Sequence, residues 1–413
     1  MLVNRFNSIP RFALPYTLGD FGAAVSAMLG PMPEARGLGL LGTSEKFWTG
    51  SGRQALQMLL MALKLERNSG VALPLFADPS LAAAIAAAGH RPVFLDIDPR
   101  FLTIDPDHLD VANGKYKAVI AVHLFGQLSD MTAVQSVAAD HPIIEDTAHA
   151  PLSFLHGRQA GDFGDCSLYS FASTKYWPAG GGGLAVVNDP DLAVRMREIV
   201  ATLPAPPMFR QLRNIIMQAM KSLVFTPQAY GITGRPLRRW TDRLALLEPR
   251  LEQVAIQRSY AAVALRQAAA MPSRVETQRA NSLRLLSQLV AIEDIVLPFE
   301  RLGARYNYHL FPVLLRDSRE RDAVMSAMWE RRVDTSMIYA NSIDECRRFG
   351  YTGGCPVSES VAGRLITLPN YASLSVRDID RVADTFISSL RAWRTSRPAY
   401  PIHSFGLKHP AVS

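Results

Sequence analysis

Cysteine and long apolar runs are both scarce in this 413-residue chain. The three cysteines, Cys166, Cys346 and Cys355, form no CxxC pair and no metal-type spacing, which argues against a disulfide framework and a zinc site. No stretch approaches the roughly 20 apolar residues of a membrane span, and the N-terminus lacks the apolar segment of a signal peptide. We therefore expect a soluble cytoplasmic protein with free thiols.

Charged and aromatic residues are also few, at 20% and 8%, and no polar low-complexity tract occurs, which excludes a largely disordered protein. The length exceeds one ordinary core, so we predict a large domain and a smaller one. Lys and Arg outnumber Asp and Glu by 44 to 37, which favours an anionic partner. Basic residues outside 198–252 are dispersed rather than clustered with aromatics, so no nucleic-acid role is expected.

Residues 51–189 alternate helical stretches with short apolar runs, among them VALPLF, PVFLDI, AVIAVHLF, PIIEDT, CSLYSF and GLAVV. Runs that are apolar on both faces are typical of strands in a mainly parallel sheet covered by helices. The pattern predicts an α/β large domain within residues 1–250. Residues 251–413 predict a linking helix and a small C-terminal α+β domain, in which YHLFPVLL is a strand and VRDIDRVADTFISSL a closing helix.

Residues 198–252 interrupt this pattern with a basic, amphipathic insertion. Five apolar residues recur there at helical spacing: Phe209, Leu212, Ile216, Met220 and Leu223. Three basic residues lie elsewhere on the helical wheel: Arg210, Arg213 and Lys221. Either the apolar stripe packs on its own chain or on a second subunit, or the segment 208–225 makes a peripheral contact with a membrane.

Three polar segments follow predicted strands or open a predicted helix: GSGRQAL at 50–56, EDTAHA at 145–150 and YSFASTK at 169–175. Their order and spacing match the needs of pyridoxal phosphate, whose aldehyde is held by a lysine amine that also carries a proton during the reaction. Lys175 follows an apolar strand and precedes a glycine-rich turn, which presents its amine at a strand end. We predict that Lys175 is this lysine rather than a solvated surface lysine.

The cofactor ring needs a buried carboxylate beside its nitrogen. Asp146 ends the apolar strand PIIED and fits this need, although an aspartate after a strand also often caps a helix. Glu145 points to the opposite face of the strand by alternation, so only one of the two acids can serve. His149 is either a neighbour of the ring or an ordinary buried histidine.

The cofactor phosphate needs backbone amides at a helix N-terminus together with hydroxyl or cationic donors. Gly52 opens the helix RQALQMLLMAL and supplies the amides, and Ser170 supplies a hydroxyl. Arg53 lies in the first helical turn, where it either bonds to phosphate or points to solvent.

These residues resemble the DegT/StrS family of pyridoxal-phosphate sugar aminotransferases, over roughly residues 40–195 and 255–390. Asp146, His149, Ser170 and Lys175 reproduce the order and spacing of the family's aspartate, ring-contacting residue, phosphate serine and lysine. The resemblance implies the fold of type I pyridoxal-phosphate enzymes, with a large domain and a smaller C-terminal one. It also implies a homodimer with sites at the subunit interface.

Four positions depart from the family pattern. Arg53 stands where the family's phosphate turn has a small hydroxyl residue, and Asp78 where many members have a ring-stacking aromatic, with Phe76 the nearest aromatic. Gly181 replaces an acidic residue after the lysine, and the family's intersubunit asparagine has no clean counterpart near Gln253. These departures indicate a divergent branch.

The resemblance implies an aminotransferase that moves an amino group from glutamate or glutamine to a nucleotide-linked or lipid-linked keto sugar. Glycan or amino-sugar biosynthesis is the expected setting. A sugar dehydratase is one alternative, but that branch tends to replace the lysine by histidine, so Lys175 argues against it. The other alternative is a non-catalytic relative that binds partners or a membrane surface through the basic insertion.

Overall fold

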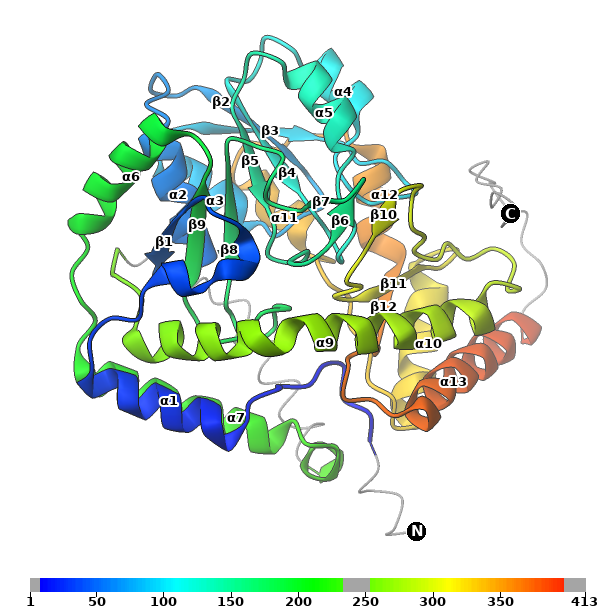
Figure 1. Cartoon of the computed structure of the whole chain (residues 1–413). Coiled ribbons are helices and arrows are strands. Elements are labelled where there is room, and N and C mark those ends of the chain that lie inside the picture. Colours follow the sequence, from blue (N-terminus) through cyan, green and yellow to red (C-terminus); the bar gives the residue numbers. More distant parts are fainter. Residues whose placement is uncertain (1–7, 233–252, 397–413) are drawn as a thin grey trace.

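The computed structural model describes residues 8–232 and 253–396 (Figure 1). A seven-stranded sheet forms the centre, in the order β1-β9-β8-β5-β4-β2-β3. The strands from β8 to β3 run parallel to one another, whereas β9 is antiparallel to both of its neighbours. The strands are β1 (Glu45–Thr49), β2 (Gly70–Pro74), β3 (Arg91–Leu95), β4 (Ala118–Val122), β5 (Ile143–Asp146), β8 (Cys166–Ser170) and β9 (Gly183–Val187).

Helices cover both faces of this sheet, which explains why its strands are apolar throughout. In β4, Ala118, Ile120 and Val122 pack toward α2 (Gly52–Ala62) and α3 (Ser80–Ala87). The alternate residues Val119 and Ala121 pack toward α4 (Pro106–Val111) and α5 (Met131–Ala138). The helix α6 (Pro190–Ala201) follows β9 and joins the α2 side. The α/β pattern predicted from the sequence is confirmed, and only β1 among these strands was not anticipated.

The C-terminal part has a core of its own, built around the two-stranded sheet of β11 (Phe311–Leu314) and β12 (Leu365–Leu368). Its helices are α10 (Ser318–Glu330), α11 (Ser342–Arg347), α12 (Pro356–Arg364) and α13 (Val376–Thr395). A small sheet pairs β10 (Ala304–Arg305) with β6 (Phe154–Leu155), which also pairs with β7 (Arg158–Gln159). The predicted strand and closing helix are found, whereas the predicted domain boundary at 250/251 lies outside the described residues and the two-domain division stays a prediction.

The helices α9, α1 and α7, whose bounds follow, lie below the central sheet in the view of Figure 1. The long helix α9 (Arg258–Leu289) runs beneath both parts of the chain and packs against α1 (Leu18–Leu29) and α13. Beside α1 lies α7 (Met208–Val224), which begins after Pro207 within the predicted insertion. Among the described residues, no helix is both long and apolar enough to cross a membrane.

A buried aspartate clasps the C-terminal part to the edge of the central sheet. Asp96, just after β3, accepts hydrogen bonds from the backbone of Val357 (2.9 Å) and Ser358 (2.7 Å) and from the Ser358 hydroxyl (2.7 Å). These amides belong to the first turn of α12, where the helix dipole also favours a negative charge. The clasp fixes α12 against β3.

Candidate active site

The predicted site residues meet in one pocket at the C-terminal ends of β4, β5 and β8. The pocket holds about 430 Å³ of space, counting its opening to solvent. Chain crossovers bring these strand ends together, which is where ligands bind in open α/β sheets. All six predicted residues line it: Gly52, Arg53, Asp146, His149, Ser170 and Lys175.

Lys175 lies in the loop after β8, and its Nζ is 2.9 Å from Nε2 of His149. Burial lowers the pKa of His149 well below its usual value, and the charge of Lys175 and the nearby His309 lower it further. The imidazole is therefore neutral at physiological pH. A neutral ring can form a hydrogen bond with the lysine amine without repelling it, and so fixes the direction of the amine.

Two residues from the C-terminal part complete the surroundings of Lys175. His309, just before β11, packs edge-on against His149 with ring centroids 4.6 Å apart. Burial, helped by the charge of Lys175, lowers the pKa of His309 to about 3. Tyr339 lines the pocket with its hydroxyl 3.4 Å from Nε2 of His149, and its backbone has φ of +59°, a strained value for a tyrosine.

Asp146, the last residue of β5, is only 7% exposed, and its Oδ1 accepts a hydrogen bond from the backbone N–H of Ala148 (3.0 Å). Burial raises its pKa, while the charge of Lys175 lowers it. A carboxylate held in so little water gains from a cation placed beside it. This environment suits the role predicted for Asp146, a partner for a protonated ring nitrogen.

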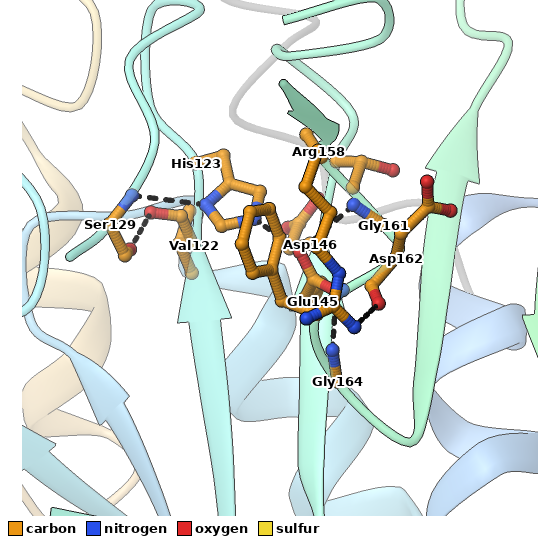
Figure 2. A network of polar contacts seen from close by, with 12 residues as sticks. Val122, His123, Ser129, Glu145, Asp146, Arg158, Gly161, Asp162 and Gly164 are labelled. Atoms are coloured by element: carbon orange, nitrogen blue, oxygen red, sulfur yellow. Dashed lines mark hydrogen bonds and ion pairs between the residues drawn. The ribbon is translucent and has the colours of Figure 1, made fainter. Parts of the chain in front are cut away.

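Glu145 points away from the pocket, as alternation along the strand predicted. Its carboxylate accepts from the backbone N–H groups of Gly161 (2.9 Å), Phe163 (2.6 Å) and Gly164 (2.6 Å). The fourth partner is His123, whose Nε2 lies 2.8 Å from the carboxylate and whose Nδ1 accepts from Ser129 N–H (Figure 2). This network ties the ends of β4 and β5 to the loop 161–164 and so fixes the strand end that carries Asp146.

The N-terminus of α2 and the end of β8 form a cup suited to an anion. Ser51 caps α2 by accepting a hydrogen bond from Gln54 N–H (3.1 Å), and Gly52 and Arg53 in the first turn of this helix line the pocket. Gly52 lies so close to Ser170 that a Cβ on Gly52 would come 2.9 Å from the Ser170 Cβ. The N-terminus of a helix, a serine and an arginine therefore line one small volume.

The structure explains one departure from the family pattern, at Gly181, and shows where Asp78 and Gln253 lie. Asp78 lines the pocket, whereas Phe76 is fully buried beside it and contacts Tyr339 edge-on. At Gly181, a Cβ would lie 2.5 Å from the ring of Tyr260 on α9, so no acidic side chain fits there. Gln253 bonds to Gln57 (2.5 Å) within its own chain.

Sequence reasoning missed Tyr339, His309 and His123. The first two lie 130 residues or more from Lys175 in the sequence, so only the tertiary fold brings them to it. His123 carried a usable signal, because it directly follows the buried strand β4 at the same sheet edge as Asp146.

Together these groups fit pyridoxal phosphate. The anion cup suits its phosphate, the buried Asp146 suits its ring nitrogen, and the amine of Lys175 suits its aldehyde. Comparison with known proteins adds further observations. The model of the DegT/DnrJ/EryC1/StrS aminotransferase family matches residues 39–387. The chain belongs to this family.

Two curated relatives, both sugar aminotransferases, match most of the chain. The chain is 26% identical over 374 residues to a UDP-N-acetyl-3-dehydro-alpha-D-glucosamine 3-aminotransferase of Acidithiobacillus ferrooxidans, covering 89% of this chain and 88% of the relative. It is 29% identical over 341 residues to a dTDP-4-dehydro-2,3,6-trideoxy-D-glucose 4-aminotransferase of Saccharopolyspora spinosa, covering 81% and 82%. A solved structure, the aminotransferase TlmJ from Streptoalloteichus hindustanus, aligns with a TM-score of 0.76 at 25% identity over 94% of this chain and all of that one.

These findings confirm the predicted family, the α/β fold class and the class of enzyme, a pyridoxal-phosphate-dependent aminotransferase of the sugar-aminotransferase kind. The alternative of a non-catalytic relative is not needed to explain the unusual phosphate turn, because Arg53 adds a cation to a cup that keeps its amides and serine.

Proposed function

We propose that Lys175 holds pyridoxal phosphate and that the protein transfers an amino group from glutamate or glutamine to a nucleotide-linked or lipid-linked keto sugar. One observation carries the proposal: the amine of Lys175 shares a single pocket with the buried carboxylate of Asp146 and the anion cup of Gly52 and Ser170. The nucleotide-linked sugars named for both curated relatives support this class of acceptor.

Each residue has a distinct task in this proposal. When bound, the cofactor supplies an aldehyde for covalent attachment and a ring that withdraws electrons from the reacting carbon. Lys175 Nζ gives and takes the proton at that carbon, and neutral His149 orients Nζ through the 2.9 Å contact. Asp146 keeps a positive charge on the ring nitrogen favourable. Gly52, Ser170 and Arg53 bind the phosphate and thereby fix the ring in the pocket.

Three further features belong to the proposal. The family resemblance suggests a homodimer with its sites at the subunit interface. The basic excess of the chain suits a nucleotide-linked or otherwise phosphorylated acceptor. Cys166, Cys346 and Cys355 are free, buried thiols, which fits a reducing cytoplasm.

The test is the visible absorption spectrum of the purified protein after incubation with pyridoxal phosphate. We expect a band from the lysine-bound cofactor that glutamate or glutamine bleaches, and that is absent from Lys175→Ala. The matched control is Lys117→Ala, which removes an exposed lysine at the far end of β4 and keeps the band. A wild-type protein without the band, or a band that persists in Lys175→Ala, contradicts the assignment of Lys175. If the band appears and is bleached as expected, the acceptor is sought among UDP-, dTDP- and GDP-linked keto sugars.

A further inference from the structure

Helix α7 has its apolar stripe on the outside. The five residues predicted to form the stripe are all exposed, from 49% at Leu212 to 71% at Phe209. The helix contacts the rest of the chain through Gln211, Ile215 and Gln218 instead. The prediction that the stripe packs on its own chain is therefore wrong for the described residues. An exposed stripe of this kind marks a surface that binds something else.

The charges of α7 favour an anionic partner. Between residues 208 and 224 the sequence has no Asp or Glu, but it has Arg210, Arg213 and Lys221. At 100° per residue the apolar stripe is centred between Leu212 and Phe209. Arg213 borders the stripe, and Arg210 and Lys221 lie between it and the buried Gln218. Arg213 and Lys221 are exposed. An apolar stripe bordered by cations is the pattern of a helix that lies in the interface of a lipid bilayer.

Helix α1 broadens this surface. It packs against α7, and the two helices form the outermost layer below α9 (Figure 1). Leu18 and Leu29 of α1 are 90% and 80% exposed. The acidic residue of α1, Asp20, is buried and paired with Arg266 (3.2 Å), so this helix adds apolar area without exposing a carboxylate.

A second copy of the chain is a poorer occupant. At 1.5 Å per residue and about 10 Å across, the outer faces of α1 and α7 offer roughly 400–500 Å², against the roughly 800 Å² that each partner buries in a typical stable interface. Two copies of α7 facing each other would also bring like charges together. Two adjacent helices suit a flat lipid surface better.

We propose that the outer faces of α1 and α7 dock on a membrane that contains anionic phospholipid. The docked helix reaches the active site, because Gln218 of α7 accepts a hydrogen bond from the Ser173 hydroxyl (2.9 Å) and donates to the Gly180 carbonyl (3.2 Å). Both residues belong to the loop that carries Lys175. The docking surface itself stands independently of the proposed sugar acceptor.

The experiment is sedimentation of the full-length protein with vesicles of phosphatidylcholine, with and without one-third phosphatidylglycerol. We expect binding to the anionic vesicles and at least tenfold weaker binding to the neutral ones. Phe209→Ser combined with Leu223→Ser, and separately Arg213→Gln combined with Lys221→Gln, each weaken binding at least tenfold. The matched control is Leu302→Ser, which removes a 94% exposed leucine elsewhere and leaves binding unchanged.

Four outcomes overturn the proposal. They are no binding to anionic vesicles, equal binding to neutral vesicles, binding that survives both double variants, and loss of binding in Leu302→Ser. A fifth is a wild-type protein that ignores vesicles but changes its mass by light scattering in Phe209→Ser/Leu223→Ser, which assigns the face to a second copy. The cofactor band and its bleaching by glutamate are measured on the same samples, and they are expected to be equal in all variants. Failure of docking and failure of the proposed aminotransferase site are therefore read separately.

Discussion

Replacing Glu145 by glutamine is expected to destabilise the protein by about 3–6 kcal/mol. The carboxylate is fully buried and receives four donors, two on each oxygen: Phe163 and Gly164 on one, Gly161 and His123 on the other. A glutamine keeps one acceptor oxygen and turns its NH2 group toward the other two donors. Two buried donors then lose their partner at about 1.5–3 kcal/mol each. The total is a large part of the 5–15 kcal/mol that holds a typical protein folded.

The assay is urea unfolding followed by far-UV circular dichroism, with midpoints compared at equal slope. The matched control is Glu45→Gln, because Glu45 pairs with Arg197 at 2.7 Å on the surface, where both side chains are at least 40% exposed. This control should lose no more than about 1 kcal/mol. If the two variants unfold at the same urea concentration, the network around Glu145 does not contribute as its geometry indicates, and the reasoning fails.

Three further changes have expected outcomes. Burial raises the pKa of Asp146, so ionising it costs folding free energy; the cost is absent below the unfolded pKa and complete above the folded one. In urea unfolding at neutral pH, cofactor-free Asp146→Asn should therefore be at least as stable as the wild type. In steady-state kinetics its transamination rate should fall at least a hundredfold. The pKa of His309 falls to about 3 on burial, so below about pH 6.5 the unfolded state binds a proton that the folded state does not. His309→Asn should therefore remove about 2 kcal/mol of the loss in unfolding free energy between pH 7 and 5. An unchanged pH dependence of the unfolding free energy in this variant would count against a buried neutral histidine. Gly52→Ala places a Cβ 2.9 Å from the Ser170 Cβ and should weaken cofactor binding about tenfold in a spectroscopic titration. The control variant Leu302→Ser should bind the cofactor as the wild type does.

Much of the architecture could be predicted because buried parallel strands leave a continuous apolar signal in the sequence. The six site residues could be found for a related reason, since Asp146 and Ser170 end neighbouring parallel strands. Tyr339 and His309 could not, because their approach to His149 depends on how the C-terminal part packs. The stripe on α7 was found by its periodicity, but periodicity alone does not say which face of a helix meets the protein. The glutamines on the buried face gave no warning that they would dock in place of the apolar residues.

The clasp at Asp96 has a bearing on how a substrate reaches the pocket. Moving the C-terminal part away from the central sheet would pull the first turn of α12 from the buried carboxylate of Asp96. That carboxylate would then lose the three donors it receives from Val357 and Ser358. Such a motion is costly, so we expect α12 to stay in place against the sheet during turnover. We therefore expect the shape of the pocket, lined by Asp78 and Arg53 among others, to select the sugar, rather than closure of the C-terminal part around the substrate.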